Sequence, residues 1–155
     1  MSGQILSRLV KLGIELPKVS LPAANYIPYM VIENLIFISG QIPVWNGELQ
    51  YNGKVGDDLS IEDGIASARL CGLNLIAQAH HAVGGNLDKI KKVIKICGFV
   101  NASTNFKEHP KVINGASDLM IDVFGEFGIH TRIAVGVSSL PLGASVEIDG
   151  IFEID

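Results

Sequence analysis

The sequence predicts one α+β domain with a mixed sheet and two long helices lying together on one face of it. Its 155 residues suffice for one domain with its own core. Strand-like segments come first, followed by a long helix, a strand, a second long helix and two closing strands. No internal repeat or linker divides the chain. One helix layer covers only one face of a sheet, so the other face calls for a partner subunit.

The composition points in the same direction. Hydrophobic residues make up 48% of the chain and charged residues only 18%, with a mean hydropathy of +0.35. No apolar run reaches the roughly 18 residues of a membrane-spanning helix, and the start MSGQILSRLVKLGIEL does not resemble a signal peptide. We therefore expect a cytoplasmic homo-oligomer that buries apolar surface between subunits. The net charge of −4 argues against a broad nucleic-acid surface.

The N-terminal half is expected to contain a short helix and three strands. Residues 1–20 form a helical extension, with Gly13 suited to end its helix. YIPYMVIE and NLIFISGQIPV are strand-like, and a third strand is expected around ELQYNG, after the turn dipeptide Asn46-Gly47.

The C-terminal half begins with a long helix. Ser60 and Asp63 resemble a capping pair at its start, and Gly84-Gly85 ends it. KVIKICGFVNA has the β-branched composition of a strand. HPKVINGASDLMIDVFGEFG follows as a helix, and two strands over roughly 131–138 and 144–154 are joined at SSLPLG.

An arginine begins the first of these closing strands. Alternation along a strand places Arg132, Ala134 and Gly136 on one face, where small residues leave room above the sheet. The other face, with Ile133 and Val135, is expected to fill a core. If the two closing strands pair as a hairpin, Arg132 and Glu147 project from the same side.

A guanidinium among small residues must reach water, a carboxylate or a ligand. The pattern on its own allows a cross-strand salt bridge or solvated edge, a ligand cradle, or a pair at a subunit interface.

Four segments resemble, in this order, those of one known family: NLIFISGQIP, IKICGFVN, KVINGASDL and TRIAVGVSSLPLGASVEIDGIFEI. The family is Rid/YjgF, named for reactive-intermediate (enamine/imine) deaminases, and the resemblance spans roughly residues 20–154. The KVINGASDL helix and the longer N-terminus are similar to the branch called endoribonuclease L-PSP-like or RidA-like. The resemblance implies a chorismate-mutase-like α+β fold, assembled as a homotrimer with ligand clefts between subunits.

The resemblance also implies roles for individual residues. Arg132 matches the arginine that binds the substrate carboxylate, and Glu147 matches the catalytic glutamate that positions or activates water. Ser39 and Gly40 match residues that orient the substrate, although Ser39 also fits an ordinary strand end.

Three further positions are implied by the same resemblance. Tyr26 matches the cleft tyrosine, with Tyr29 as a rival. Asn114 matches an asparagine lining the cleft, although a plain helix-surface role fits equally. Ala134 stands where typical enamine/imine deaminases carry a cysteine, which puts in doubt whether the same small substrate is used.

The function implied is hydrolysis of a 2-aminoacrylate-like enamine, or its imine, to a 2-keto acid and ammonia. The resemblance implies no cofactor, no metal, and a small carboxylate-bearing metabolite as the ligand, with no membrane partner. A non-catalytic trimer that binds small carboxylates is the alternative, favoured by Ala134. An endoribonuclease is the third reading, although the sequence offers no histidine pair for acid–base cleavage.

Overall fold

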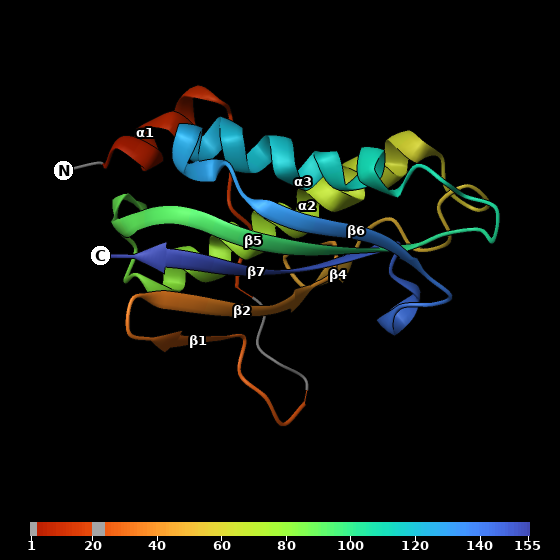
Figure 1. Cartoon of the computed structure of the whole chain (residues 1–155), viewed down its shortest axis with the longest axis horizontal. Helices are drawn as coiled ribbons and strands as arrows, with labels where there is room; N and C mark the ends of the chain where they lie inside the picture. Colours follow the sequence, from red (N-terminus) through yellow and green to blue (C-terminus); the bar gives the residue numbers. More distant parts are fainter. Residues whose placement is uncertain (1–2, 20–23) are drawn as a thin grey trace.

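The computed structural model describes residues 3–19 and 24–155, which form a five-stranded mixed sheet with helices along one side (Figure 1). The α+β class predicted from the sequence is confirmed. The elements are α1 (Gln4–Lys11), β1 (Tyr29–Ile32), β2 (Leu35–Gln41), β3 (Val44–Trp45), β4 (Glu48–Leu49), α2 (Ile61–Ala82), η1 (Leu87–Lys89), β5 (Ile90–Asn101), α3 (His109–Phe124), η2 (Gly125–Gly128), β6 (Thr131–Val137), η3 (Pro141–Gly143) and β7 (Val146–Ile154).

The strands of the main sheet lie in the order β1-β2-β7-β5-β6. All neighbouring pairs are antiparallel except β5 and β6, which run parallel because α3 carries the chain back between them. The expected third strand shrinks to β4, which pairs only with β3. The turn between them has positive φ at Asn46 (49°) and Gly47 (91°), which confirms the predicted hairpin turn.

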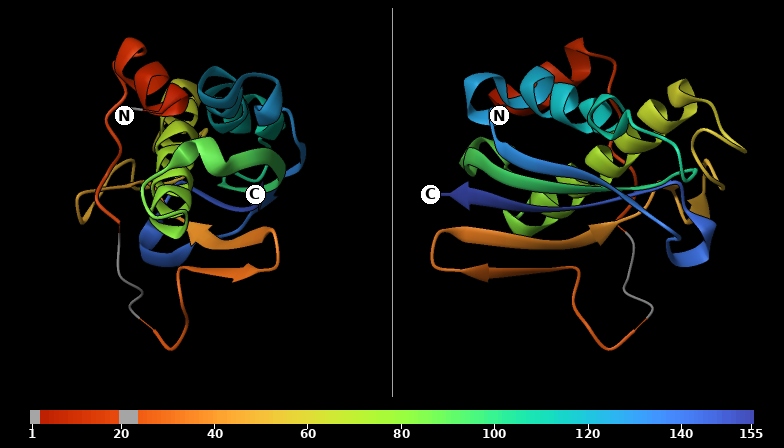
Figure 2. Two further views of the ribbon diagram at one scale, coloured as in Figure 1. Left: turned by 90° about the vertical axis from the view of Figure 1, so that its left-hand side faces the viewer. Right: turned by 45° about the vertical axis from the view of Figure 1, so that its right-hand side comes forward.

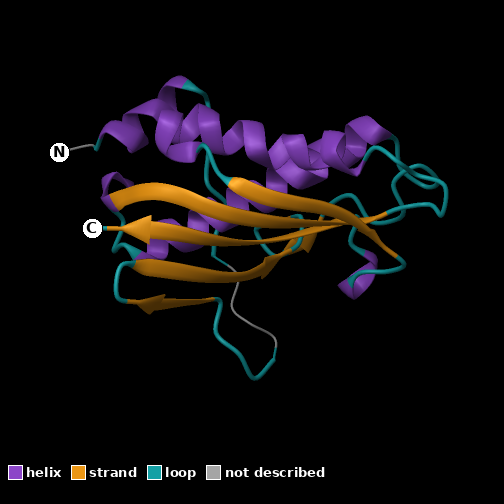
Figure 3. Ribbon diagram, viewed as in Figure 1, coloured by secondary structure: helices purple, strands orange, loops and turns teal. Residues whose placement is uncertain are grey.

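Helices α2 and α3 form the layer that covers one face of the sheet (Figures 2 and 3). Helix α2 packs on β7 and β2, and α3 lies beside it over β5 and β6. The predicted capping pair is present, since Ser60 accepts from Asp63 N and the Asp63 side chain accepts from Ser60 N. The helices approach closely at Gly115, where a Cβ would collide with the Ile65 carbonyl oxygen.

Helix α1 occupies residues 4–11 of the segment expected as a helical extension, and residues 14–19 have no regular structure. Gly13 has a φ of 66° and follows the helix, as predicted. Asp88 accepts hydrogen bonds from the amides of Gln4 and Ile5 at 2.9 Å each, so a distant carboxylate caps the helix. Residues 1, 2 and 20 of that segment lie outside the described residues.

The two closing strands do not pair as a hairpin, the condition on which the expected facing of Arg132 and Glu147 depended. Strand β5 lies between β6 and β7, and pairs with both. The connection over residues 138–145 is long enough to pass the end of β5, because skipping one strand requires a span of only about 10 Å. Consequently the two closing strands are not neighbours, and the direction in which their side chains point follows from the register that each strand has with β5.

The expected core face of β6 is also wrong. Ile133 and Val135 lie on the sheet face away from the helices and are 45% and 40% exposed. Arg132, Ala134 and Gly136 face the helix layer instead. Because Ala134 and Gly136 are small, α3 can lie close above this strand, and a Cβ at Gly136 would collide with the His109 ring.

The sheet face away from the helices carries exposed apolar side chains. They are Met30 and Ile32 on β1, Phe37 on β2, and Ile133 and Val135 on β6. This is the uncovered face that the sequence predicts. Within the described ranges, no helix has the length and apolar character needed to cross a membrane.

Candidate active site

Arg132 lies at the start of the edge strand β6, and its guanidinium is held by helix α3. Nη1 donates to Ser117 Oγ at 3.0 Å, and Nη2 donates to the Pro110 carbonyl oxygen at 3.3 Å. These bonds use two of the five N–H groups of the side chain, leaving three for other acceptors. The head group is therefore oriented by the protein without being saturated by it.

No carboxylate pairs with Arg132 among the described residues, whose ion pairs are Lys91–Asp155 and Lys111–Glu108. Both acceptors of Arg132 are neutral, and the residue is half-buried. The cross-strand salt bridge that the sequence allowed is therefore absent. A positive charge that is fixed and partly desolvated favours binding of an anion with a planar pair of oxygens.

A short hydrogen-bond chain fixes the arginine further. The Gly128 carbonyl lies 2.6 Å from His130 Nδ1 and can only accept, so that nitrogen carries a proton. His130 Nε2 lies 2.9 Å from the Ser117 hydroxyl, the same group that accepts a hydrogen bond from Arg132. Sequence reasoning missed both Ser117 and His130. The available signal was helical spacing, since Ser117 follows Asn114 by three residues.

Asn114 lies on the stripe of α3 that faces Arg132. Positions 110, 114 and 117 share one face of a helix, and the outer two supply both acceptors of the guanidinium. Asn114 is exposed between them, so its amide is available to a ligand beside Arg132. Ala134 lies next on the same face of β6. These residues make the first half of the candidate site.

Glu147 forms the centre of a second half on the other face of the sheet. Its register partner is Phe99, which in turn pairs with Val135. Partial burial, and secondly the nearby Asp149 carboxylate, raise the pKa of Glu147 above its usual value. This carboxyl group is thus suited to exchange protons closer to neutrality than an exposed glutamate.

Ser39 and Gly40 lie where β2 meets Glu147. Pairing shifts by one residue between Ile38 and Gln41, so these two residues form a β-bulge. A Cβ on Gly40 would collide with Glu147 Oε1, which explains why glycine is needed here. Ser39 Oγ donates to the Ile27 carbonyl at 2.9 Å and fixes the segment before β1.

Both candidate tyrosines line one cavity of about 570 Å³ together with Ser39. The Tyr29 hydroxyl lies 2.7 Å from His81 Nδ1 and is therefore occupied by a partner within the chain. Tyr26 is 53% exposed, and its hydroxyl has no hydrogen-bond partner in the described part of the chain. Tyr26 is thus the tyrosine whose hydroxyl is available to a ligand.

The two halves face away from each other. In register, Arg132 is level with Ile96 and Gly150, whereas Glu147 is level with Phe99 and Val135. Directly paired residues share a face, so Arg132 faces the helices and Glu147 faces the uncovered side. The expectation that the two project from one side of a hairpin is therefore wrong. The described residues also contain no group of three or more side chains suited to hold a metal ion.

Comparison with known proteins identifies a family that this sequence matches over nearly its whole length. The profile of the family described as "YjgF/chorismate_mutase-like, putative endoribonuclease" matches residues 6–152. Protein TCP17 of Trypanosoma cruzi is 43% identical over 155 residues, covering 99% of this chain and 96% of its own.

Two solved structures are similar to this chain in both sequence and fold. Atu1372 of Agrobacterium tumefaciens, a protein described as of unknown function, is 46% identical with a TM-score of 0.91, covering 97% of this chain and 92% of its own. A protein of Shewanella oneidensis described as a putative endoribonuclease is 38% identical with a TM-score of 0.93, covering 97% and 99%.

More distant structures share the fold at 25% identity. They are TdcF of E. coli with bound serine (TM-score 0.62, covering 91% of this chain and 96% of its own) and RidA of an Antarctic Psychrobacter (TM-score 0.61, covering 90% and 97%). The profile match extends over nearly the whole chain, and the relatives match at nearly full length. The chain is therefore a member of the YjgF/chorismate mutase-like family.

Proposed function

We propose that this protein hydrolyses small enamine/imine acids, such as 2-aminoacrylate and its imine tautomer, to 2-keto acids and ammonia. The observation that carries the proposal is the Arg132 guanidinium, which is oriented by Ser117 and Pro110 but has no carboxylate partner among the described residues. Its free N–H groups suit a substrate carboxylate. Asn114, on the same helix stripe, would receive or donate a further hydrogen bond.

Glu147 would manage the proton transfers. As the base, its carboxylate takes a proton from water while the water oxygen bonds to the carbon of the protonated imine. The C=N electron pair moves to nitrogen and gives a neutral carbinolamine. Glu147 then returns the proton to the amino nitrogen. As the C–N bond breaks and ammonia leaves, the Glu147 carboxylate takes the hydroxyl proton and the C=O bond forms. The imine carbon is already electrophilic, so this reaction needs no cofactor.

The site would require two copies of the chain. Because Arg132 and Glu147 face opposite sides of one sheet, one small molecule does not reach both within a single copy. We place the edge strand β6 of one copy beside the Tyr26, Ser39 and Gly40 region of the next, in a homotrimer with three such clefts. The exposed apolar side chains of the uncovered face support association of this kind.

The cytoplasm is the proposed location. Cys71 and Cys97 are both free, which is compatible with a reducing compartment. Two similar structures support this substrate class. One is named RidA, and the other, TdcF, contains bound serine, an amino acid with the kind of carboxylate that Arg132 would bind.

Ala134 favours a second candidate, a trimer that binds small carboxylates without turning them over. A side chain of this size beside Arg132 leaves room but supplies no reactive group. The endoribonuclease named by the family description is the third candidate. The described cavities argue against this candidate, because His109 is the one histidine in their linings and acid–base cleavage of RNA would use a pair.

The decisive experiment generates imine in place with an amino-acid oxidase and measures how fast it is converted to keto acid. Arg132→Ala should lower kcat/KM by about 10²-fold or more, because two charge-assisted hydrogen bonds to a carboxylate are lost. Arg132→Lys should recover only part of it, since lysine lacks the planar fork. The matched control is Arg69→Ala, which removes an exposed arginine on α2.

Equal rates for the wild type and Arg132→Ala would refute the proposed role. Calorimetric binding of pyruvate that depends on Arg132, with no turnover of any imine, would select the binding protein instead. Cleavage of single-stranded RNA would select the endoribonuclease.

A further inference from the structure

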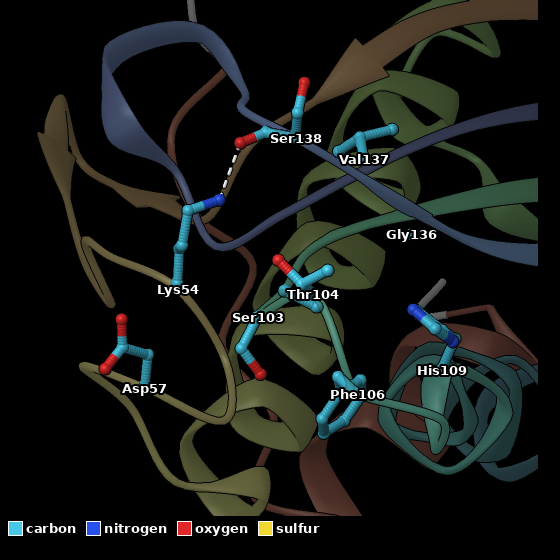
Figure 4. A pocket seen from close by; sticks show the side chains of 10 residues that line it. Lys54, Asp57, Ser103, Thr104, Phe106, His109, Gly136, Val137 and Ser138 are labelled. Carbon is cyan, nitrogen blue, oxygen red and sulfur yellow. Dashed lines mark hydrogen bonds between the residues drawn. The ribbon is translucent and has the colours of Figure 1, made fainter.

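A second cavity, of about 650 Å³, lies at the far end of β6 from Arg132 (Figure 4). It is bounded by the loop before α2, the loop after β5 and the first turn of α3. Its volume is within the range of sites for small organic molecules. None of the residues assigned above to imine hydrolysis lines this cavity. A ligand bound here would therefore serve a function beyond the one proposed.

Lys54 supplies a fixed positive charge on one side of this cavity. Its Nζ donates to Asn101 Oδ1 at 2.8 Å and to the Ser138 carbonyl oxygen at 2.6 Å. Both acceptors are neutral, and no carboxylate pairs with Lys54 in the described residues. An ammonium group has three protons, so one remains for a ligand. A half-buried charge held in this way lacks a compensating anion.

The loop that carries Lys54 is tied to the rest of the cavity. Val55 N donates to the Asn101 carbonyl, and Ser103 N donates to the Val55 carbonyl, at 2.9 and 3.0 Å. At Gly56, where φ is 90°, a Cβ would crowd Ser103 Oγ and the Phe106 ring. The two loops are therefore in close, ordered contact, and Lys54 and Ser103 are held in place by the fold.

The opposite side of the cavity is formed by His109, with Ser103 and Thr104 between it and Lys54 in the view of Figure 4. The His109 ring packs edge-on against Phe106, with ring centroids 5.2 Å apart. In the described residues, neither this imidazole nor the hydroxyls of Ser103 and Thr104 have a hydrogen-bond partner. Three polar groups thus line a cavity with their hydrogen-bonding capacity unused.

The start of α3 adds to the positive potential. The helix begins at His109 without a side-chain cap from Glu108. Pro110 has no N–H, and the Lys111 amide donates to the Glu108 carbonyl, so the His109 amide is the one left for a ligand at this end, where the helix dipole favours an anion. The exposed carboxylate of Asp57 lines the cavity on the Lys54 side and opposes an anion there. Exposure to water weakens that repulsion, while Lys54 is half-buried and fixed.

We propose that this cavity binds a small organic oxyanion, a carboxylate or phosphate ester, through Lys54, with His109 and the hydroxyls of Ser103 and Thr104 as further partners. The ligand bridges the two loops and the start of α3. The Asp57 carboxylate opposes the bound anion and so lowers its affinity.

The test measures binding of two probes, citrate and inorganic phosphate, to the full-length protein by calorimetry and by amide shifts in NMR spectra. Binding should shift the amides of Thr104, Gly136 and Ser138. Lys54→Gln should weaken binding about 10- to 100-fold, because a charge-assisted hydrogen bond is lost. Asp57→Asn, a matched change of one nearby charge, should tighten binding several-fold.

Lys54→Gln also loses the bonds to Asn101 and Ser138, so His109→Ala, which breaks neither, serves as the second variant and should weaken binding several-fold. Arg132→Ala should leave binding at this cavity unchanged. No shift at these amides with about 10 mM of either probe, or equal affinity for the wild type and both weakened variants, would overturn the proposal. Loss of binding in Arg132→Ala would show instead that the anion occupies the other site. If imine hydrolysis is not observed, this result is unaffected.

Discussion

Complementation between inactive variants tests the two-copy site directly. Arg132→Ala retains Glu147, and Glu147→Gln retains Arg132. If each cleft takes its arginine from one chain and its glutamate from the next, mixed oligomers regain complete clefts although each variant alone has none. The basis is the sheet register, which places the two side chains on opposite faces of one chain.

The size of the effect follows from counting. In an equal, random mixture, a cleft is complete when its arginine side comes from the Glu147→Gln chain and its glutamate side from the Arg132→Ala chain. Each condition holds for about half of the chains, so about a quarter of the clefts are active in a closed ring of copies. Imine turnover should therefore reach about a quarter of the wild-type rate after co-expression or joint refolding.

A second mixture separates the two arrangements independently. An equal mixture of wild type with the double variant, Arg132→Ala with Glu147→Gln, should have about a quarter of the activity of the same total amount of pure wild type if clefts are shared, and about half if each chain is self-sufficient. No recovery in the first mixture together with half the activity in the second would refute the two-copy site.

Three further predictions concern single positions. Gly40→Ala should displace the Glu147 carboxylate by about 1 Å and lower kcat/KM about 10²-fold, with little change in the urea midpoint, and full activity would contradict the contact at Gly40. For Glu147, the raised pKa stabilises the protonated fold, so stability is lost as pH rises through that pKa. Urea unfolding should then show the wild type losing stability relative to Glu147→Gln as pH rises above about 4, the ordinary pKa of a glutamate, whereas a constant difference would contradict the raised pKa. Gly115→Ala should reduce the free energy of unfolding by about 1–3 kcal/mol because the new Cβ meets the Ile65 carbonyl, and a loss below about 0.5 kcal/mol in urea unfolding would contradict this packing.

The sequence by itself determined the elements and their order. The capping pair at Ser60 and Asp63, the turn at Asn46 and Gly47, and the termination at Gly13 are local signals, because each depends on neighbours within a few residues. The single helix layer expected from the order of elements also predicted a sheet face left uncovered by helices. The motif segments led to the same family as the later comparisons.

Only the tertiary structure decided which strands are neighbours and which way their side chains face. A hairpin between the closing strands satisfied every local pattern, yet β5 lies between them. The prediction of which face of β6 points toward the core was wrong for a related reason. In the proposed assembly, one face of β6 is covered by helices and the other by another copy, so apolar residues would not mark the interior of a single chain.

The candidate site divides in the same way. Arg132 and Glu147 stood out as charged residues in apolar strands, but their separation onto two faces is a property of sheet order. Ser117 and His130 acquire their connection to Arg132 only when α3 folds over β6, and Lys54 and His109 line one cavity only because two loops and the start of α3 converge there. Such groupings join residues far apart in sequence, and long-range packing alone brings them together.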